Sequence, residues 1–221
     1  MNSEFERNGF ALIPGVLSAD RVSGIKGILG ENDGAGRRGL LALSEVRELA
    51  ESDLLISLLR PVCAAAPFPV RAIYFDKSPE TNWLVSWHQD LTIAVNQRIE
   101  LPGFGPWSVK NGLTHVQPPV QMLERMVTIR LHLDDADAEN GALQVIPGSH
   151  LLGKLDAETI QRMRLESEAV LCEAASGDAL LMRPLLLHAS GRSSSPRHRR
   201  VLHLEYACEQ LPGVLQWRQD A

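Results

Sequence analysis

From residue 70 onward the chain consists of short β-like segments separated by turn residues. The segments are rich in Val, Leu, Ile and aromatic residues, and Gly, Pro, Asn and Asp stand between them. We predict strands at 70–75, 83–88, 126–133, 142–146, 169–172, 179–182, 185–190 and 200–207. Roughly eight short strands with marked turns predict a barrel or a sandwich.

Residues 1–69 follow the helical period instead. Ser18-Ala19-Asp20 is typical of a helix start, and a second helix is expected near Ser44, after the break at Gly34-Ala35-Gly36. The apolar residues at helical spacing are Val22, Ile25, Ile28 and Leu29 in the first helix and Val46, Leu49, Ile56 and Leu59 in the second. We expect one mainly β domain, 1–221, in which helical residues 1–69 support a β core at 70–207.

Residues 96–125 combine prolines and glycines with no clear period. We expect a long irregular loop there, and loops of that length inside a compact domain are usually functional or disordered. Trp107 and Lys110 are the candidates in this loop for contact with a substrate.

Charge and cysteine content narrow the classes of partner. The 221 residues are 44% hydrophobic with a formal net charge of -5, and the single dense basic run, at 197–200, is too short for a nucleic-acid footprint. No segment has the signature of a secretory signal or a membrane span. Cys63, Cys172 and Cys208 lack metal-binding or disulfide spacing. We expect a cytoplasmic protein with a small-molecule substrate and no nucleic-acid or membrane partner.

A His-x-Asp pair, His88 and Asp90, follows a strongly β-type segment. In an extended chain these two side chains lie on the same side. If a distant histidine joins them, the three ligands occupy one face of an octahedral metal, which is the facial triad of non-haem iron(II) oxygenases. His188, on a later predicted strand, is the candidate for the third ligand.

Two rival pairs have similar spacing: His132 with Asp134, and His203 with Glu205. A barrel needs several strands between the pair and the distal histidine if all are to meet at one end. The His88 pair has more predicted strands before His188 than the His132 pair has, and Asp134 leads into an acidic turn. We therefore favour His88 and Asp90.

Three predicted strands each have a polar and an apolar face. The polar faces contain His188 with Ser190, Thr128 with Arg130, and Arg199 with His203. Such faces point to water in an ordinary sheet, but in a small barrel they can line a cavity, and alternation alone leaves both arrangements open. If they line a cavity, Arg199 suits the far carboxylate of an iron-chelating 2-oxo acid, because a guanidinium matches a carboxylate in two-pronged geometry, and the Ser190 hydroxyl can assist.

Several motifs in order resemble the phytanoyl-CoA dioxygenase family over nearly the whole chain. They are the opening segment 8–17, Trp87-His88-Gln89-Asp90-Leu91, Asn140-Gly141-Ala142-Leu143, Pro147-Gly148-Ser149-His150, and His188-Ala189-Ser190 with Arg199 eleven residues after His188. The resemblance implies a double-stranded β-helix (jelly-roll, cupin-like) core and an oxidoreductase that depends on iron(II), 2-oxoglutarate and O2.

The resemblance also implies individual roles. His88, Asp90 and His188 would bind the metal, and Arg199 with Ser190 would bind 2-oxoglutarate. Arg130, with Thr128 on the same face, would lie near the co-substrate or meet an anionic substrate. Related halogenases have a small residue in place of the carboxylate, so Asp90 favours hydroxylation of a C–H bond with release of succinate and CO2. An acyl-CoA substrate does not follow from the family name.

Two other functions use the same ligands. One is a metal-binding jelly roll without oxygenase activity, a sensor or structural domain, but such a domain has no need for Arg199 and Ser190. The other is a zinc hydrolase, which would need a Glu or His base beside the metal, and none is evident near either motif.

Overall fold

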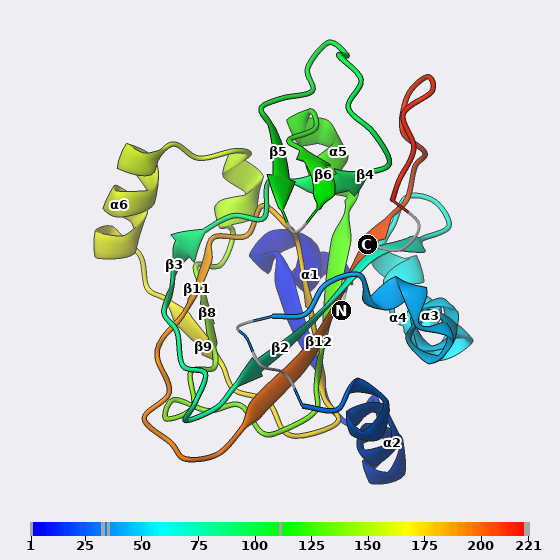
Figure 1. Ribbon diagram of the computed structural model, residues 1–221. Coiled ribbons are helices and arrows are strands. Elements are labelled where there is room, and N and C mark those ends of the chain that lie inside the picture. The colour runs from blue at the N-terminus through cyan, green and yellow to red at the C-terminus, as the bar shows by residue number, and fades with distance from the viewer. Residues whose placement is uncertain (1, 32–33, 35, 111, 219–221) are drawn as a thin grey trace.

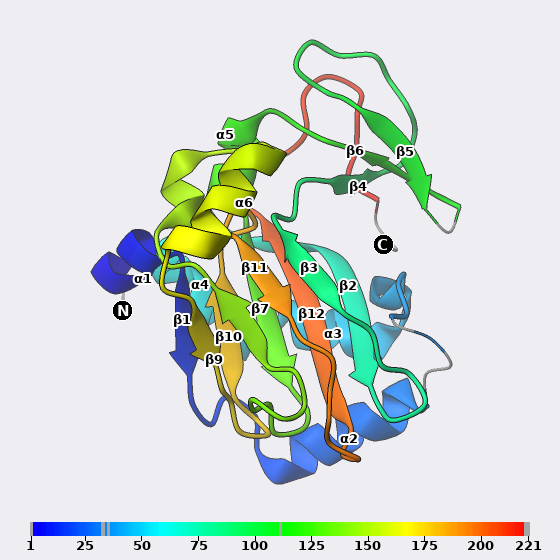
Figure 2. The same cartoon turned by 90° about the vertical axis from the view of Figure 1, so that its left-hand side faces the viewer.

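The protein folds around two antiparallel sheets that face each other, as a computed structural model covering residues 2–31, 34, 36–110 and 112–218 shows (Figures 1 and 2). The five-stranded sheet has the order β1 (Phe10–Ile13), β10 (Ala179–Met182), β7 (Val127–His132), β12 (Arg199–Ala207) and β2 (Phe68–Lys77). The four-stranded sheet has the order β3 (Val85–His88), β11 (His188–Ser190), β8 (Leu143–Val145) and β9 (Val170–Cys172). Each predicted strand region therefore contains an observed strand, whereas β1 was not expected.

Helices α2 (Ala19–Leu29), α3 (Ser44–Glu51) and α4 (Asp53–Leu59) cover the outer face of the five-stranded sheet (Figure 1). The predicted second helix is divided at Ser52, because its hydroxyl accepts a hydrogen bond from the amide of Leu55 and so caps a new helix. Two further helices, α1 (Asn2–Asn8) and α6 (Ala157–Glu166), were not predicted. Among the described residues, no helix is long and apolar enough to cross a membrane.

Strand β12 separates an apolar layer from a polar interior. Leu202, Leu204 and Tyr206 are fully buried in the cluster shared with the helices, and the Tyr206 hydroxyl donates to the carbonyl of Ala50 in α3 at 2.9 Å. The alternate residues Arg199, His203 and Glu205 line a cavity between the sheets instead. The polar face predicted from the alternation therefore points inward, not to water.

The structure corrects the expectation that 96–125 is wholly irregular. The segment contains the hairpin β5 (Trp107–Lys110) and β6 (Leu113–Val116), followed by α5 (Val120–Arg125), and β6 also pairs with β4 (Ile93–Val95). This three-stranded sheet stands above one end of the two larger sheets (Figure 2). Its apolar side packs with Leu215 and Trp217, which are distant in sequence. The segment therefore has no regular hydrophobic pattern of its own from which the strands could be predicted. Residues 96–106 remain without helix or strand.

We expect Leu131→Ala to lower the free energy of unfolding by about 2–5 kcal/mol, since a fully buried leucine leaves a cavity when truncated. Leu131 is 0% exposed and lies between its strand partners Ala179 and Leu202. Urea denaturation checks this, with Leu165→Ala as control because Leu165 is 74% exposed. Equal effects of the two substitutions would contradict the assigned core.

Candidate metal centre

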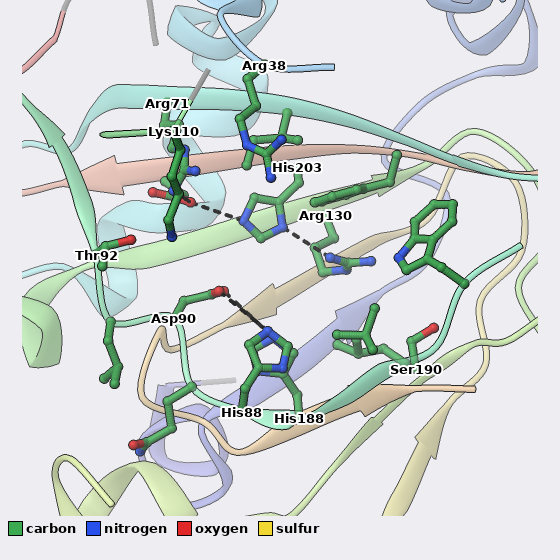
Figure 3. A pocket seen from close by; sticks show the side chains of 18 of the residues that line it. Arg38, Arg71, His88, Asp90, Thr92, Lys110, Arg130, His188, Ser190 and His203 are labelled. Atoms are coloured by element: carbon green, nitrogen blue, oxygen red, sulfur yellow. Dashed lines mark hydrogen bonds and ion pairs between the residues drawn. The ribbon is translucent and has the colours of Figure 1, made fainter. Parts of the chain in front are cut away.

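Pairing of β3 with β11 brings two histidines 100 positions apart in the chain side by side. His88, the last residue of β3, is the register partner of His188, the first residue of β11, and their ring centroids are 4.2 Å apart. Asp90 follows two residues later, with carboxylate oxygens 3.8 Å from Nε2 of each histidine. In the described part of the chain this is the one His-Asp-His group whose ligand atoms all lie within 4.8 Å of one another (Figure 3).

Backbone carbonyls fix both imidazoles in a form ready to bind a cation. Nδ1 of His88 lies 2.8 Å from the carbonyl oxygen of Ser86, and Nδ1 of His188 lies 2.8 Å from that of Leu186. A carbonyl oxygen only accepts hydrogen bonds, so each Nδ1 carries the proton and each Nε2 keeps a free lone pair. Both lone pairs are on the nitrogens nearest Asp90.

Electrostatics keep His188 and Asp90 in the protonation states that metal binding requires. Burial lowers the pKa of His188 to about 4, so the ring is neutral near pH 7. Burial alone would raise the pKa of Asp90, but in acid, where the histidines are protonated, the charges of His188, His203 and His88 outweigh it and bring that pKa to about 2. A neutral imidazole and an ionised carboxylate are the forms that bind metals.

Gln89, between the two residues of the His-x-Asp pair, holds this turn in place through its side-chain amide. Its amide nitrogen donates to the carbonyls of Gly153 (2.8 Å) and Leu185 (2.7 Å), and its amide oxygen accepts from the amide of Leu155 (2.8 Å). The Asp90 amide in turn donates to the carbonyl of Pro184 at 2.9 Å. The Gln89 side chain thus fixes the His-x-Asp turn to two separate segments.

A cavity of about 370 Å³ lies between the sheets beside these three residues. At one end lies Arg199, 3% exposed, and among the described residues its guanidinium has no hydrogen-bond or ion-pair partner. Burial, together with the nearby charge of Arg130, lowers the pKa of Arg199 to about 9. A buried cation without a partner is costly, and an anion in the cavity would remove that cost.

Sequence reasoning missed Lys77, which is 0% exposed and is the register partner of Arg199. Its ammonium donates to the Ser190 hydroxyl at 2.8 Å and to the Gly191 carbonyl, and the Ser190 hydroxyl donates to the carbonyl of Gly141 at 2.8 Å. The predicted strand stopped at residue 75. Two residues more would have placed Lys77 on the same face as Arg71 and Phe75.

Gly141 makes room for that lysine. Its φ is 76°, and a Cβ there would lie 3.1 Å from Nζ of Lys77 and 2.6 Å from the carbonyl oxygen of Gly191. Glycine at position 141 therefore permits both the left-handed backbone of the turn and the close approach of the Lys77 ammonium.

A chain of polar contacts crosses the cavity wall from Arg130. Nη1 of Arg130 lies 3.1 Å from Nδ1 of His203, and Nε2 of His203 is 3.5 Å from a carboxylate oxygen of Glu205. The same oxygen accepts a hydrogen bond from Arg71 at 3.1 Å. Arg71 and Arg38 also line the cavity, and neither was predicted from the sequence. The alternation along β2 could have identified Arg71, whereas Arg38 lies outside any strand and has no such pattern.

The other predicted residues divide into two groups. Arg130, Ser190 and Lys110 line the cavity, whereas Thr128 and Trp107 do not. Thr128 is 1% exposed and its hydroxyl lacks a hydrogen-bond partner among the described residues. The rival pair at 132–134 is split: His132 is buried, and Asp134 binds Arg200 and Lys26 instead.

Several solved structures resemble this fold. EctD from S. alaskensis in its apoform has a TM-score of 0.73 at 20% identity, covering 100% of this chain and 84% of its own. The epimerase SnoN, in complex with Fe3+, alpha ketoglutarate and nogalamycin RO, has a TM-score of 0.72 at 17% identity, covering 96% and 89%. SnoK, a non-heme alpha ketoglutarate dependent carbocyclase from nogalamycin biosynthesis, has a TM-score of 0.69 at 18% identity, covering 99% and 85%. The expected mainly β, jelly-roll fold class is thereby confirmed.

No curated protein matches the chain. The family model described as Phytanoyl-CoA dioxygenase (PhyH), however, matches residues 5–201, which include both histidines, Asp90 and Arg199. The match spans nearly all of the two-sheet core and most of its helical support. On that evidence the chain belongs to the phytanoyl-CoA dioxygenase family.

Proposed function

We propose that this protein is an iron(II)- and 2-oxoglutarate-dependent dioxygenase that hydroxylates a C–H bond of a small molecule, with O2 as co-substrate and succinate and CO2 as products. One observation carries the proposal: a His-Asp-His group shares a cavity with Arg199, a buried guanidinium without an acceptor among the described residues. A domain that only held a metal would gain nothing from an unpaired buried arginine, which costs stability until an anion arrives.

The donor set fits iron(II). His88, Asp90 and His188 offer two neutral imidazole nitrogens and one carboxylate oxygen, the set found in the 2-His-1-carboxylate sites of non-haem iron(II) oxygenases. Iron held in this way supplies the O2-dependent oxidation, with positions left open for co-substrate. The protein's own contribution is orientation, because the carbonyls of Ser86 and Leu186 hold both rings in place.

The far carboxylate of 2-oxoglutarate would bind Arg199. Lys77, the strand partner of Arg199, is hydrogen-bonded to Ser190 at this end of the cavity. Arg130 lies beside Arg199, and burial lowers the pKa of Arg130 to about 10. The cationic end of the cavity is thus matched to a dianion that also chelates the metal. This supports 2-oxoglutarate over a monoanionic co-substrate.

The choice of hydroxylation among the possible reactions rests on Asp90. SnoN is an epimerase and SnoK a carbocyclase, so this fold accommodates several reactions. Hydroxylation is favoured for this chain because Asp90 supplies a carboxylate where a halogenase would have a small residue. We further infer a cytoplasmic site of action, in keeping with three free cysteines.

Anaerobic addition of iron(II) and 2-oxoglutarate should produce the weak visible charge-transfer band of the metal-bound 2-oxo acid. His88→Ala should abolish it, because one of the ligands is lost. His198→Ala is the matched control, since His198 contacts Asp76 away from the triad. A wild-type protein without the band, or a His88→Ala variant that retains it, would contradict the proposed metal site.

Arg199→Ala should weaken 2-oxoglutarate binding about 10- to 100-fold, the equivalent of about one charge-assisted hydrogen bond. Iron binding should be nearly unchanged, because Arg199 is not a ligand. Titration of the band with 2-oxoglutarate measures the first effect, and iron binding without co-substrate measures the second. Arg197→Ala, which removes an exposed arginine bound to Asp137, is the control. Equal loss of metal and co-substrate would exclude the assigned role.

Lys77 should make the stability of the metal-free protein depend on pH. Burial and the charges of Arg199, Arg130 and Arg192 lower its pKa from 10.5 to about 7. Between about pH 7 and pH 10.5 the unfolded chain therefore holds more protons than the folded one, and stability should rise with pH. Below pH 7 the cost of a charged Lys77 is fully present.

The variant Lys77→Met should remove this contribution and flatten the rise between about pH 7 and 8.5. Urea denaturation at several pH values measures it, with Lys154→Met as the control, because Lys154 bonds Gln117 outside the Arg199 end of the cavity. Identical pH dependence in wild type and Lys77→Met would show that the folded protein accommodates the charge without cost.

A further inference from the structure

A second group of cations lies at the other end of the same cavity. Arg38, Arg71 and Lys110 line it, and Figure 3 shows them on the side opposite His88 and His188. We call these three residues the outer cation cluster. They come from the segment before α3, from β2 and from the end of β5, so three separate parts of the fold bring positive charge to one place.

Among the described residues, Glu205 is the one carboxylate that forms an ion pair with this cluster. Glu205 bonds Arg71 at 3.1 Å, and the same oxygen also faces His203 at 3.5 Å. Arg71 is 9% exposed, and its Nε has no hydrogen-bond partner among the described residues. Part of a nearly buried guanidinium therefore has no acceptor even with Glu205 in place.

The other two cations have no such partner. In the described chain neither Arg38 nor Lys110 forms a hydrogen bond or ion pair with a carboxylate, and Nε of Arg38 is buried without an acceptor. Burial and the neighbouring charge of Arg71 lower the pKa of Arg38. Like charges held together in a partly desolvated cavity repel each other, and a bound anion would turn that repulsion into attraction.

The place of this cluster follows from the division of the cavity. 2-Oxoglutarate would fill the end at Arg199 and reach the metal. The outer cation cluster then remains on the far side of the metal, facing the space left for the molecule to be oxidised. A cavity of about 370 Å³ is near the small end of the range of ligand pockets, about 300–1,000 Å³, and two molecules must share it.

We propose that the outer cation cluster binds an anionic group, a carboxylate or phosphate, of a small substrate and so directs the substrate's C–H bond to the metal. This inference rests on the proposed function. A guanidinium forms paired hydrogen bonds with either oxyanion, Arg38 and Lys110 add charge at the mouth, and Glu205 keeps Arg71 in position. A long apolar substrate without charge fits this wall poorly.

The test uses the protein loaded anaerobically with iron(II) and saturating 2-oxoglutarate, so that the Arg199 end is filled. Two probe pairs differ in charge: benzoate with the similarly shaped benzamide, and methylphosphonate with its neutral dimethyl ester. Isothermal titration calorimetry should show each anion binding about tenfold or more tightly than its neutral partner, the size expected for hydrogen bonds to charged groups.

Variants locate the effect. Arg38→Gln and Lys110→Gln should each weaken anion binding several-fold and leave the charge-transfer band intact. Arg162→Gln, an exposed arginine on α6, removes the same charge elsewhere and should change neither. Arg71 is left unaltered, because its loss would leave Glu205 buried and unpaired, which is destabilising.

Each failure has a separate meaning. If the charge-transfer band does not form, the proposed function fails. If the band forms but neutral probes bind as well as anions, neither kind of probe binds, or Arg38→Gln and Lys110→Gln bind anions as wild type does, the inference about the substrate is overturned while the metal site stands. Preference for the phosphonate or for the carboxylate identifies which anion the site takes.

Discussion

The site depends on the register between β3 and β11. Their antiparallel pairing places His88 opposite His188, and a slip of one residue would turn one of the two imidazoles to the other face of the sheet. The register shifts between His188 and Ser190, with the extra residue in β3, and alternation along β11 places the imidazole and the hydroxyl on the same face. Asp90 then follows β3 at the edge where both rings meet.

The interior of the two-sheet core is unusually rich in positive charge. Arg199, Arg130 and Lys77 lie at one end of the cavity region and the outer cation cluster at the other, with Asp90 and Glu205 as the carboxylates of its lining. Desolvation makes such an arrangement costly in the empty protein. Packing of the helices on the apolar outer face of the sheet offsets this unfavourable free energy. Anionic ligands would stabilise the folded protein further when they bind.

Much of the site could be predicted from the sequence because alternation is a strong signal in strands. It placed His188, Ser190 and Arg199 on the polar faces of their strands, which the structure shows to line the cavity, and the motifs in order identified the family, as the family model confirms. Alternation failed where a strand end was misjudged, as at Lys77, and where a residue lies outside any strand, as at Arg38. The hairpin β5–β6 was missed because its packing partner, Trp217, is about a hundred residues away.

Gln89 has a consequence beyond the metal turn. Its side chain joins the turn between His88 and Asp90 to the segment 153–155, which leads directly into α6. Helix α6 has no fully buried residue and packs on the core through the partly buried Ile160 and Met163, so its position depends in part on such anchors. Local opening of α6 and loosening of the metal turn would therefore form one cooperative event, and amide protons around Gly153 would report on occupancy of a site they do not touch.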